Sequence, residues 1–265
     1  MLVLVASIAI VLALVVGYVR SAAVNSDQFA NRATAAGRSD AVRSLAAERI
    51  TDELILGVRG MYLCHTFCEL GGTPLSEALD QLHDFLVANP NEVVVIVNQD
   101  YVTPQDFVDA ATKAGLDKLA YPGPTAAGGW PTLREMIDSN QRVVFLAENH
   151  AGAAPWYHLA YKAITQETPY AFSKAKQLTD PAALDASCRP YRGPASAPLF
   201  LVNHWVTTDP LPRPSDAERV NAYEPLMRRL QTCRRIRHHL PNLVAVNFYR
   251  RGDLERAVDT LNGIK

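Results

Sequence analysis

The sequence predicts an α/β fold built on parallel strands, and three observations lead to this expectation. Short apolar runs alternate with amphipathic segments from Val58 onward. The run Val93–Val97 is continuously apolar rather than alternating, as in strands that are covered on both faces. Polar residues directly follow several of these runs, and parallel α/β proteins bind their ligands at the carboxyl ends of strands.

Five apolar runs predict strands, because each is short and is bounded by turn residues or by an amphipathic segment. They are Val58–Leu63, Val93–Val97, Arg142–Leu146, Leu199–Val202 and Leu243–Val246. A closed barrel needs eight strands, so five predict an incomplete one.

Helical periodicity and end signals predict the segments between the strands. Pro74–Ala88 carries its leucines on one face, and Pro104–Ala114 has proline in its first turn and Gly115 past its end. Further helices are expected at Pro131–Ile137, Asp216–His238 and Leu254–Leu261. Gly- and Pro-rich composition predicts loops over Tyr121–Gly129 and Thr179–Pro198.

Residues 1–19 are almost wholly apolar and approach the ~20 residues that span a bilayer, so residues 1–20 are the expected membrane segment. This pattern predicts a transmembrane anchor, or alternatively a signal peptide cleaved near Ser21-Ala22-Ala23. Residues 21–56 have a broken helical period and are expected to form a helical membrane-proximal segment. The α/β domain then occupies residues 57–265, and we expect it to be membrane-anchored or exported, outside the cytoplasm.

Four cysteines, an even number, accompany this export-type segment and favour disulfides. Cys64 and Cys68 are close enough for a local loop, and Cys188 and Cys233 are then the second pair. The alternative is four reduced cysteines in a cytosolic domain.

The net charge of −1 gives no global basic field, so no nucleic-acid partner is expected. The one basic cluster runs from Arg228 to His239, and we interpret it as the solvated face of a helix.

Polar side chains at strand ends predict the functional site, because the carboxyl ends of parallel strands meet at one edge. His65 ends the first apolar run and is the candidate for acid–base chemistry. Arg59 lies at the start of the same run and is a candidate phosphate contact. The other strand-end candidates are Asn98, Asp100, Glu148, Asn203 and His204.

Five blocks of sequence together resemble the phosphatidylinositol-specific phospholipase C X-domain-like proteins, in their secreted bacterial and plant branch. The blocks are LCHTFCELGGTPLSEAL, NPNEVVVIVNQDYV, WPTLREMIDSNQRVVFLAEN, APLFLVNHW and LPNLVAVNFYRRGDLERAVDTLNG. The resemblance runs from Leu56 to the C-terminus. It implies a distorted (β/α) TIM-type barrel, a PLC-like phosphodiesterase acting on phosphatidylinositol or related phosphodiesters.

The resemblance also implies roles for individual residues. His65 matches the histidine that protonates the leaving alcohol, and Asp100 is the carboxylate expected near a calcium ion. Asn98, Glu148, Asn203 and His204 are expected to contact substrate.

Two departures from the family pattern keep a second function open. No histidine precedes His65, although the relatives carry an earlier catalytic one, and Gln99 replaces a strand-end carboxylate that would suit calcium. The domain is therefore expected to be a phosphodiesterase, with a membrane-tethered module that binds a phosphate or inositol headgroup without cleavage as the alternative. A chain whose incomplete barrel does not fold alone is the third reading.

Overall fold

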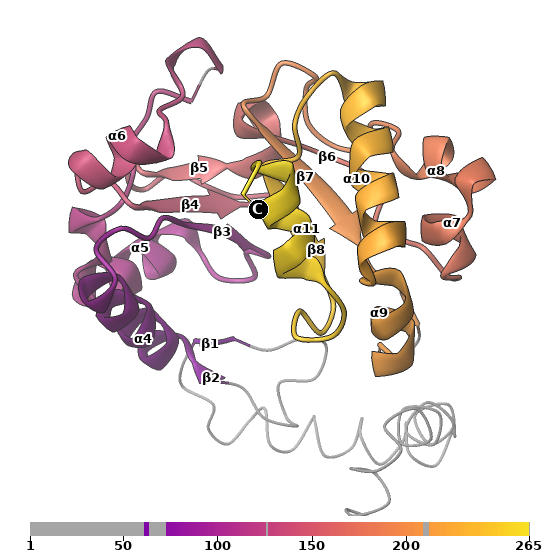
Figure 1. Cartoon of the computed structure of the whole chain (residues 1–265). Coiled ribbons are helices and arrows are strands. Elements are labelled where there is room, and N and C mark those ends of the chain that lie inside the picture. Colours follow the sequence, from indigo (N-terminus) through magenta and orange to yellow (C-terminus); the bar gives the residue numbers. More distant parts are fainter. Residues whose placement is uncertain (1–60, 64–72, 126, 209–211, 265) are drawn as a thin grey trace, which may run out of the picture. The chain divides into compact units, whose positions relative to one another are not determined.

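The computed structural model describes residues 61–63, 73–125, 127–208 and 212–264 (Figure 1). The predicted segments 1–20 and 21–56 lie outside the described residues, as do Arg59, Cys64, His65 and Cys68. The chain divides into two compact units. The described parts of unit 2 are residues 61–167 and 190–201, and those of unit 1 are residues 168–189 and 202–264, with the gaps given above.

Unit 2 contains a parallel sheet of three strands in the order β3-β4-β5. These strands are β3 (Val94–Asn98), β4 (Val143–Ala147) and β5 (Tyr157–Leu159). Val94 pairs with Val143 and Asn98 with Ala147, so β3 and β4 end level with each other. Both strands occur where the apolar runs predicted them, and β4 is buried along its whole length, as its uninterrupted apolar sequence requires.

The core of unit 2 forms where helices α4 (Leu75–Ala88) and α5 (Pro104–Lys113) pack on this sheet (Figure 1). Phe107 of α5 meets Phe145 of β4 edge-on at 5.5 Å between ring centroids and stacks on Tyr157 at 4.6 Å. The Thr103 side chain caps α5 and Pro104 begins it, as the sequence predicts. A short antiparallel pair, β1 (Tyr62–Leu63) and β2 (Thr73–Pro74), precedes α4.

Helix α6 (Leu133–Asp138) begins two residues later than predicted, because Thr132 is its cap. The Thr132 hydroxyl accepts a hydrogen bond from the Glu135 backbone N–H at 3.2 Å, and the Glu135 carboxylate accepts one from the Thr132 N–H at 2.7 Å. This reciprocal capping box fixes where the helix starts.

A second three-stranded sheet has the order β6-β7-β8, with β6 (Thr165–Glu167) parallel to β7 (Leu199–His204). Strand β8 (Leu243–Val246) has the bounds that the sequence predicts. A single π-helical turn, η4 (Ala160–Ile164), links β5 to β6. The sequence did not predict β5 or β6, because each has three residues and β6 reads Thr-Gln-Glu without an apolar run.

The strands of the described segments form these separate sheets, and no closed barrel is found among them. No helix in the described part of the chain is long and apolar enough to cross a membrane. The α/β class with parallel strands is thus confirmed.

Unit 1 carries the helices of the C-terminal part and α7 (Lys176–Thr179). The predicted helix Asp216–His238 is wrong as a single element: it is α9 (Pro214–Val220) followed by α10 (Tyr223–Arg237). Asn221 makes the break, because its side-chain amide donates to the carbonyls of Asn247 and Arg251 at 3.0 and 3.1 Å. Its own carbonyl accepts from the Asp253 N–H at 2.8 Å, so the loop after β8 occupies groups that a continuous helix would use.

The predicted loop Thr179–Pro198 is wrong in part, because it contains helix α8 (Pro181–Ser187). Asp180 caps this helix and Pro181 occupies its first turn, a start signal within a Pro- and Ala-rich stretch. The last helix, α11 (Leu254–Leu261), has the predicted bounds.

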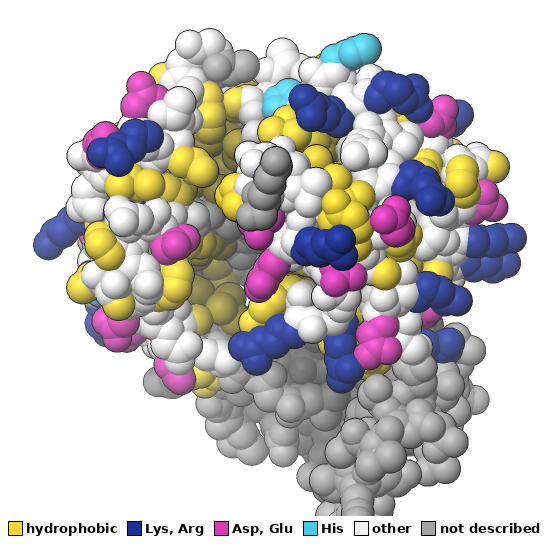
Figure 2. All heavy atoms as spheres, in the orientation of Figure 1, with side chains coloured by type: hydrophobic (Ala, Val, Ile, Leu, Met, Phe, Trp, Pro, Cys, Tyr) yellow, Lys and Arg dark blue, Asp and Glu magenta, His cyan; other side chains and the backbone are white. Residues whose placement is uncertain are grey.

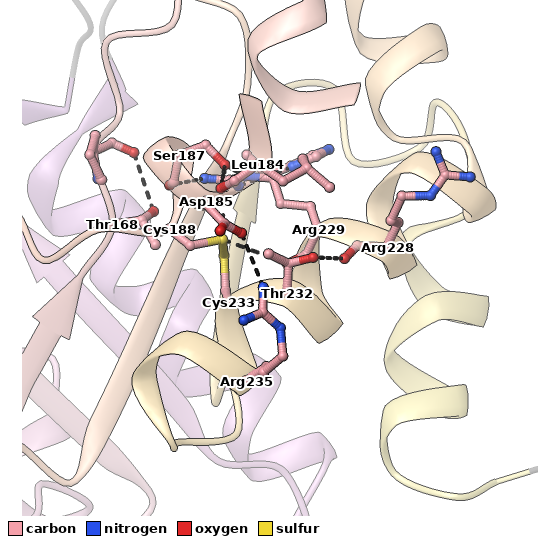
Figure 3. The surroundings of a disulfide bond; sticks show 12 residues. Thr168, Leu184, Asp185, Ser187, Cys188, Arg228, Arg229, Thr232, Cys233 and Arg235 are labelled. Carbon is pink, nitrogen blue, oxygen red and sulfur yellow. Dashed lines mark hydrogen bonds and ion pairs between the residues drawn. A yellow bond between two sulfur atoms is a disulfide. The ribbon is translucent and has the colours of Figure 1, made fainter. Parts of the chain in front are cut away.

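The disulfide between Cys188 and Cys233 joins the end of α8 to α10 (Figure 3). These two cysteines are among the four disulfide candidates of the sequence. Both cysteines are fully buried, and the Arg229 guanidinium hydrogen-bonds to Ser187 beside them, donating from Nε to the hydroxyl at 2.9 Å. Arg229 and Cys233 lie one helical turn apart on α10. Their polar and covalent contacts therefore hold α8 against α10 at two adjacent points.

We expect the double variant Cys188→Ser/Cys233→Ser to lose about 4 kcal/mol of unfolding free energy in non-reducing buffer. The two cysteines are 45 residues apart, and the loop-entropy relation gives that size for such a closed loop. Urea unfolding measures the loss. In reducing buffer the native chain and the variant should unfold at nearly the same urea concentration, and a difference that persists there would contradict the assignment.

Candidate functional site at the strand ends

Two predicted site residues lie together at the carboxyl ends of β3 and β4 in unit 2. Asn98 ends β3, and its carbonyl accepts a hydrogen bond from the Glu148 N–H at 3.0 Å. The Asn98 amide donates to the Tyr157 hydroxyl at 3.0 Å. The level ends of the two strands bring these side chains to one edge, as the strand-end pattern predicted.

Glu148 belongs to a cluster of four side chains that we call the Arg192 cluster: Glu148, Tyr161, Glu167 and Arg192. The Arg192 guanidinium donates from Nη2 to Glu148 Oε1 and to the Tyr161 hydroxyl, both at 3.1 Å, and from Nε to Glu167 Oε1. The Tyr161 hydroxyl donates to Glu167 Oε2 at 3.0 Å. One cation thus ties together the residues that follow β4, end β6 and form the π-helical turn.

The backbone beside β6 explains how Arg192 reaches this position. The Arg192 backbone carbonyl accepts a hydrogen bond from the Glu167 N–H at 2.9 Å, and the Tyr191 N–H donates to the Glu167 carbonyl at 3.0 Å. Gly193 follows at a φ of 79°, and a Cβ there would lie 1.9 Å from the Thr165 carbonyl oxygen. Only glycine permits this close approach of the loop to the strand.

Burial makes these contacts strong. The Glu167 side chain is 1% exposed, that of Glu148 16% and that of Arg192 31%. Burial, and then the charge of Glu167, raise the pKa of Tyr161, which therefore stays protonated as a donor. Burial alone would lower the pKa of Arg192, but its hydrogen bond to Glu167 and the neighbouring charges raise it overall. The cluster carries one positive and two negative charges.

Asp100, the predicted metal ligand, holds the loop after β4. Its Oδ1 accepts from the Asn149 N–H at 2.8 Å, and its Oδ2 accepts from the His150 N–H at 2.6 Å and lies 2.9 Å from the His150 ring. Burial would raise the pKa of Asp100, but these hydrogen bonds outweigh it and lower the pKa below its ordinary value.

In this arrangement the described strand-end carboxylates are engaged within the protein. Asp100 uses both oxygens on the loop, whereas Glu148 and Glu167 already hold a guanidinium. The described segments contain no group of three or more His, Cys, Asp or Glu side chains placed to bind a metal. The metal role of Asp100 stays a prediction.

Asn203 and His204 end β7 in unit 1, where both are buried. The Asn203 amide donates to the Thr168 carbonyl at 2.8 Å. The His204 ring lies with Nε2 2.8 Å from the Val220 carbonyl and Nδ1 3.1 Å from the Arg229 guanidinium. These partners imply a neutral ring that carries its proton on Nε2. Burial, and then the charge of Arg229, lower the pKa of His204 to about 3.

Comparison with known proteins identifies the family. The family model described as PI-PLC X 1 matches residues 19–262. The chain belongs to the PI-PLC X domain family. No solved structure matches it.

Two curated relatives carry the family name. A PI-PLC X domain-containing protein 1 of Arthroderma benhamiae is 30% identical over 241 residues, which cover 81% of this chain and 77% of that protein. A PI-PLC X domain-containing protein of Arabidopsis thaliana is 28% identical over 246 residues. That match covers 82% of this chain and 55% of the plant protein.

The family resemblance placed His65 at the centre of the site, and His65 and Arg59 lie outside the described residues, so their roles stay predictions. The substrate roles of Asn98, Glu148, Asn203 and His204 are likewise untested. Sequence reasoning missed Tyr161, Glu167 and Arg192. Only Glu167 had a usable signal, a carboxylate that ends a strand, and the strand itself was too short and polar to be recognised.

The buried His204 predicts a pH dependence of stability in this PI-PLC X domain. Its pKa is about 3 in the folded protein and about 6.5 when unfolded, so the unfolded state binds the extra proton between these values. The stabilisation is complete above pH 6.5 and falls by about 1.4 kcal/mol per pH unit below it. Between pH 7 and 5, urea unfolding of the native chain should therefore show about 2 kcal/mol more loss than His204→Gln shows. His238→Asn, at an exposed position, is the matched control, and an unchanged slope in His204→Gln would refute the assignment.

Proposed function

We propose that this PI-PLC X domain is a phosphodiesterase of the phospholipase C type that acts on phosphatidylinositol or a related phosphodiester at the cell envelope. The observation that carries the proposal is the family match over residues 19–262, which includes the block around His65. The strand-end position of Asn98 and Glu148 supports it, because parallel α/β proteins bind substrates at this edge.

In the proposed reaction His65 is the general acid. Its protonated ring gives a proton to the leaving alcohol as the phosphodiester bond breaks, and Arg59 contacts the phosphate. Asn98 and Glu148 hydrogen-bond to substrate hydroxyls. Asn203 and His204 are buried at the end of β7, and their polar atoms are engaged within the protein. Their proposed role is therefore to support the end of this strand.

The second candidate function is binding of a phosphate or inositol headgroup without cleavage. The engaged carboxylates favour it. Asp100 holds a loop, and Glu148 and Glu167 hold Arg192, so the described acidic groups at this edge already serve the fold. In both cases we propose that residues 1–20 anchor the domain to the membrane and that the domain lies outside the cytoplasm.

Turnover of phosphatidylinositol by the purified full chain in detergent tests the proposal. We expect release of the phosphorylated headgroup and a loss of at least about 10²-fold in kcat for His65→Ala, as for removal of a general acid. His83→Ala is the matched control, because His83 lies on α4 at a partly exposed position, and it should retain activity.

Equal turnover in His65→Ala would contradict the role of His65. A folded chain that shows no turnover but binds inositol phosphate would favour the binding function. Headgroup release should be followed with calcium and with chelator. Asp100 holds a loop and Glu148 and Glu167 hold Arg192, so we expect similar rates.

A further inference from the structure

The charges of this nearly neutral chain are segregated between its two units. The described residues of unit 1 include thirteen Lys and Arg against eight Asp and Glu. Those of unit 2 include six against twelve, although the whole chain carries a formal charge of only −1. A separation of this kind creates a positive field around unit 1 that the overall composition hides.

The excess positive charge includes a patch on α10, where Arg228, Arg234 and Arg235 are exposed. Arg228 and Arg235 are seven residues apart and therefore share one face of the helix. Arg189 is also exposed, and the disulfide between Cys188 and Cys233 brings it to the same helix. We call Arg189, Arg228, Arg234 and Arg235 the α10 cation patch. Lys and Arg side chains are visible across the side of unit 1 that carries α10 and α8 (Figure 2).

The acidic groups near this patch balance it only in part. Asp185 pairs with Arg235 at 3.0 Å, and both side chains are well exposed to solvent (Figure 3). Glu224 lies one turn before Arg228 on α10. Exposed ion pairs of this kind are weak, so they leave most of the positive potential available.

Helix stability alone does not account for the patch. Cations in the last turn of a helix offset its dipole, which explains Arg234 and Arg235. Arg228 lies in the middle of α10, so its position gains nothing from that effect.

A turn in unit 1, held near the N-terminal end of α10 by the Asn221 contacts, presents aromatic side chains to solvent. Between β8 and α11, Phe248 and Tyr249 are 40% and 58% exposed, and the Arg251 N–H closes the turn on the Phe248 carbonyl at 2.7 Å. Arg250 donates from Nε to the Tyr249 hydroxyl at 3.0 Å. Exposed aromatic rings beside arginines are the composition that favours a membrane–water interface.

We propose that unit 1 docks on an anionic lipid bilayer through the α10 cation patch. Anionic phospholipids attract such clusters, and each Lys or Arg held at the surface strengthens binding about fivefold. The choice of lipid among polyanions rests on the proposed function, which places the substrate in a membrane. The patch would then hold against the bilayer surface a domain that residues 1–20 are proposed to tether to the membrane.

Vesicle partitioning of the full chain tests the proposal. Binding is measured on vesicles of phosphatidylcholine alone and of phosphatidylcholine with 30 mol% phosphatidylglycerol, neither of which contains phosphatidylinositol. The ratio of the two partition coefficients isolates the electrostatic part from any contribution of the apolar N-terminal residues. We expect phosphatidylglycerol to raise partitioning at least about tenfold at low salt and the gain to fall steeply toward 0.5 M salt.

The double variant Arg228→Gln/Arg234→Gln should lose most of this gain, about tenfold, because it removes two exposed patch cations. Arg134→Gln is the matched control, since it removes an exposed arginine from α6 of unit 2 and should keep the gain. An undiminished gain in the double variant, an equal loss in Arg134→Gln, or a gain that survives 0.5 M salt would overturn the proposal. Equally tight binding to a single-stranded oligonucleotide would also overturn it in favour of general polyanion binding. Because no substrate is present, failure here leaves the proposed phosphodiesterase activity to its own test.

Discussion

The ion pairs of Arg192 with Glu148 and Glu167 are the constraint on which the strand-end edge of unit 2 depends. The two carboxylates come from the residue after β4 and the last residue of β6, which no sheet pairing joins directly. A buried carboxylate such as Glu167 is tolerated only with a partner cation and further hydrogen bonds, which Arg192 and Tyr161 provide. The loop that carries Arg192 must therefore lie against β6. Gly193 permits this close approach, because a Cβ there would clash with the Thr165 carbonyl.

Unit 1 also buries a charged side chain, Arg229, but stabilises it with neutral hydrogen-bond acceptors. Arg229 is fully buried, and among the described residues it makes no ion pair. Carbonyl oxygens of Ser187 and Asn203, the Ser187 hydroxyl and the His204 ring accept its hydrogen bonds instead, and burial lowers its pKa to about 9. Burial, and then the charge of Arg229, keep His204 neutral. The nearby disulfide holds together α8 and α10, which carry Ser187 and Arg229. Histidine at a strand end therefore serves packing in one unit, whereas the family resemblance assigns catalysis to His65.

The elements that the sequence predicted well are those that local physics determines. The apolar run of β4, the Pro and Thr signals of α5 and the Cys188–Cys233 pairing all depend on composition and spacing. The break at Asn221 and the strand Thr165–Glu167 were not predictable, because tertiary hydrogen bonds create both. The strand-end rule placed Asn98 and Glu148 correctly at one edge. It could not find Arg192, a loop residue that reaches the edge only because the chain returns beside β6.

A double-mutant cycle on Glu167 and Arg192 tests the central claim most directly. Urea unfolding of the native chain, Glu167→Gln, Arg192→Gln and the double variant yields the coupling free energy. Arg192 is about one-third exposed, so we reduce the usual 3–5 kcal/mol for a broken buried pair and expect Glu167→Gln to cost about 2 kcal/mol. The double variant should recover at least about 1 kcal/mol relative to the sum of the single variants. Additive losses within about 0.5 kcal/mol would show that the two side chains are not coupled and would contradict this account.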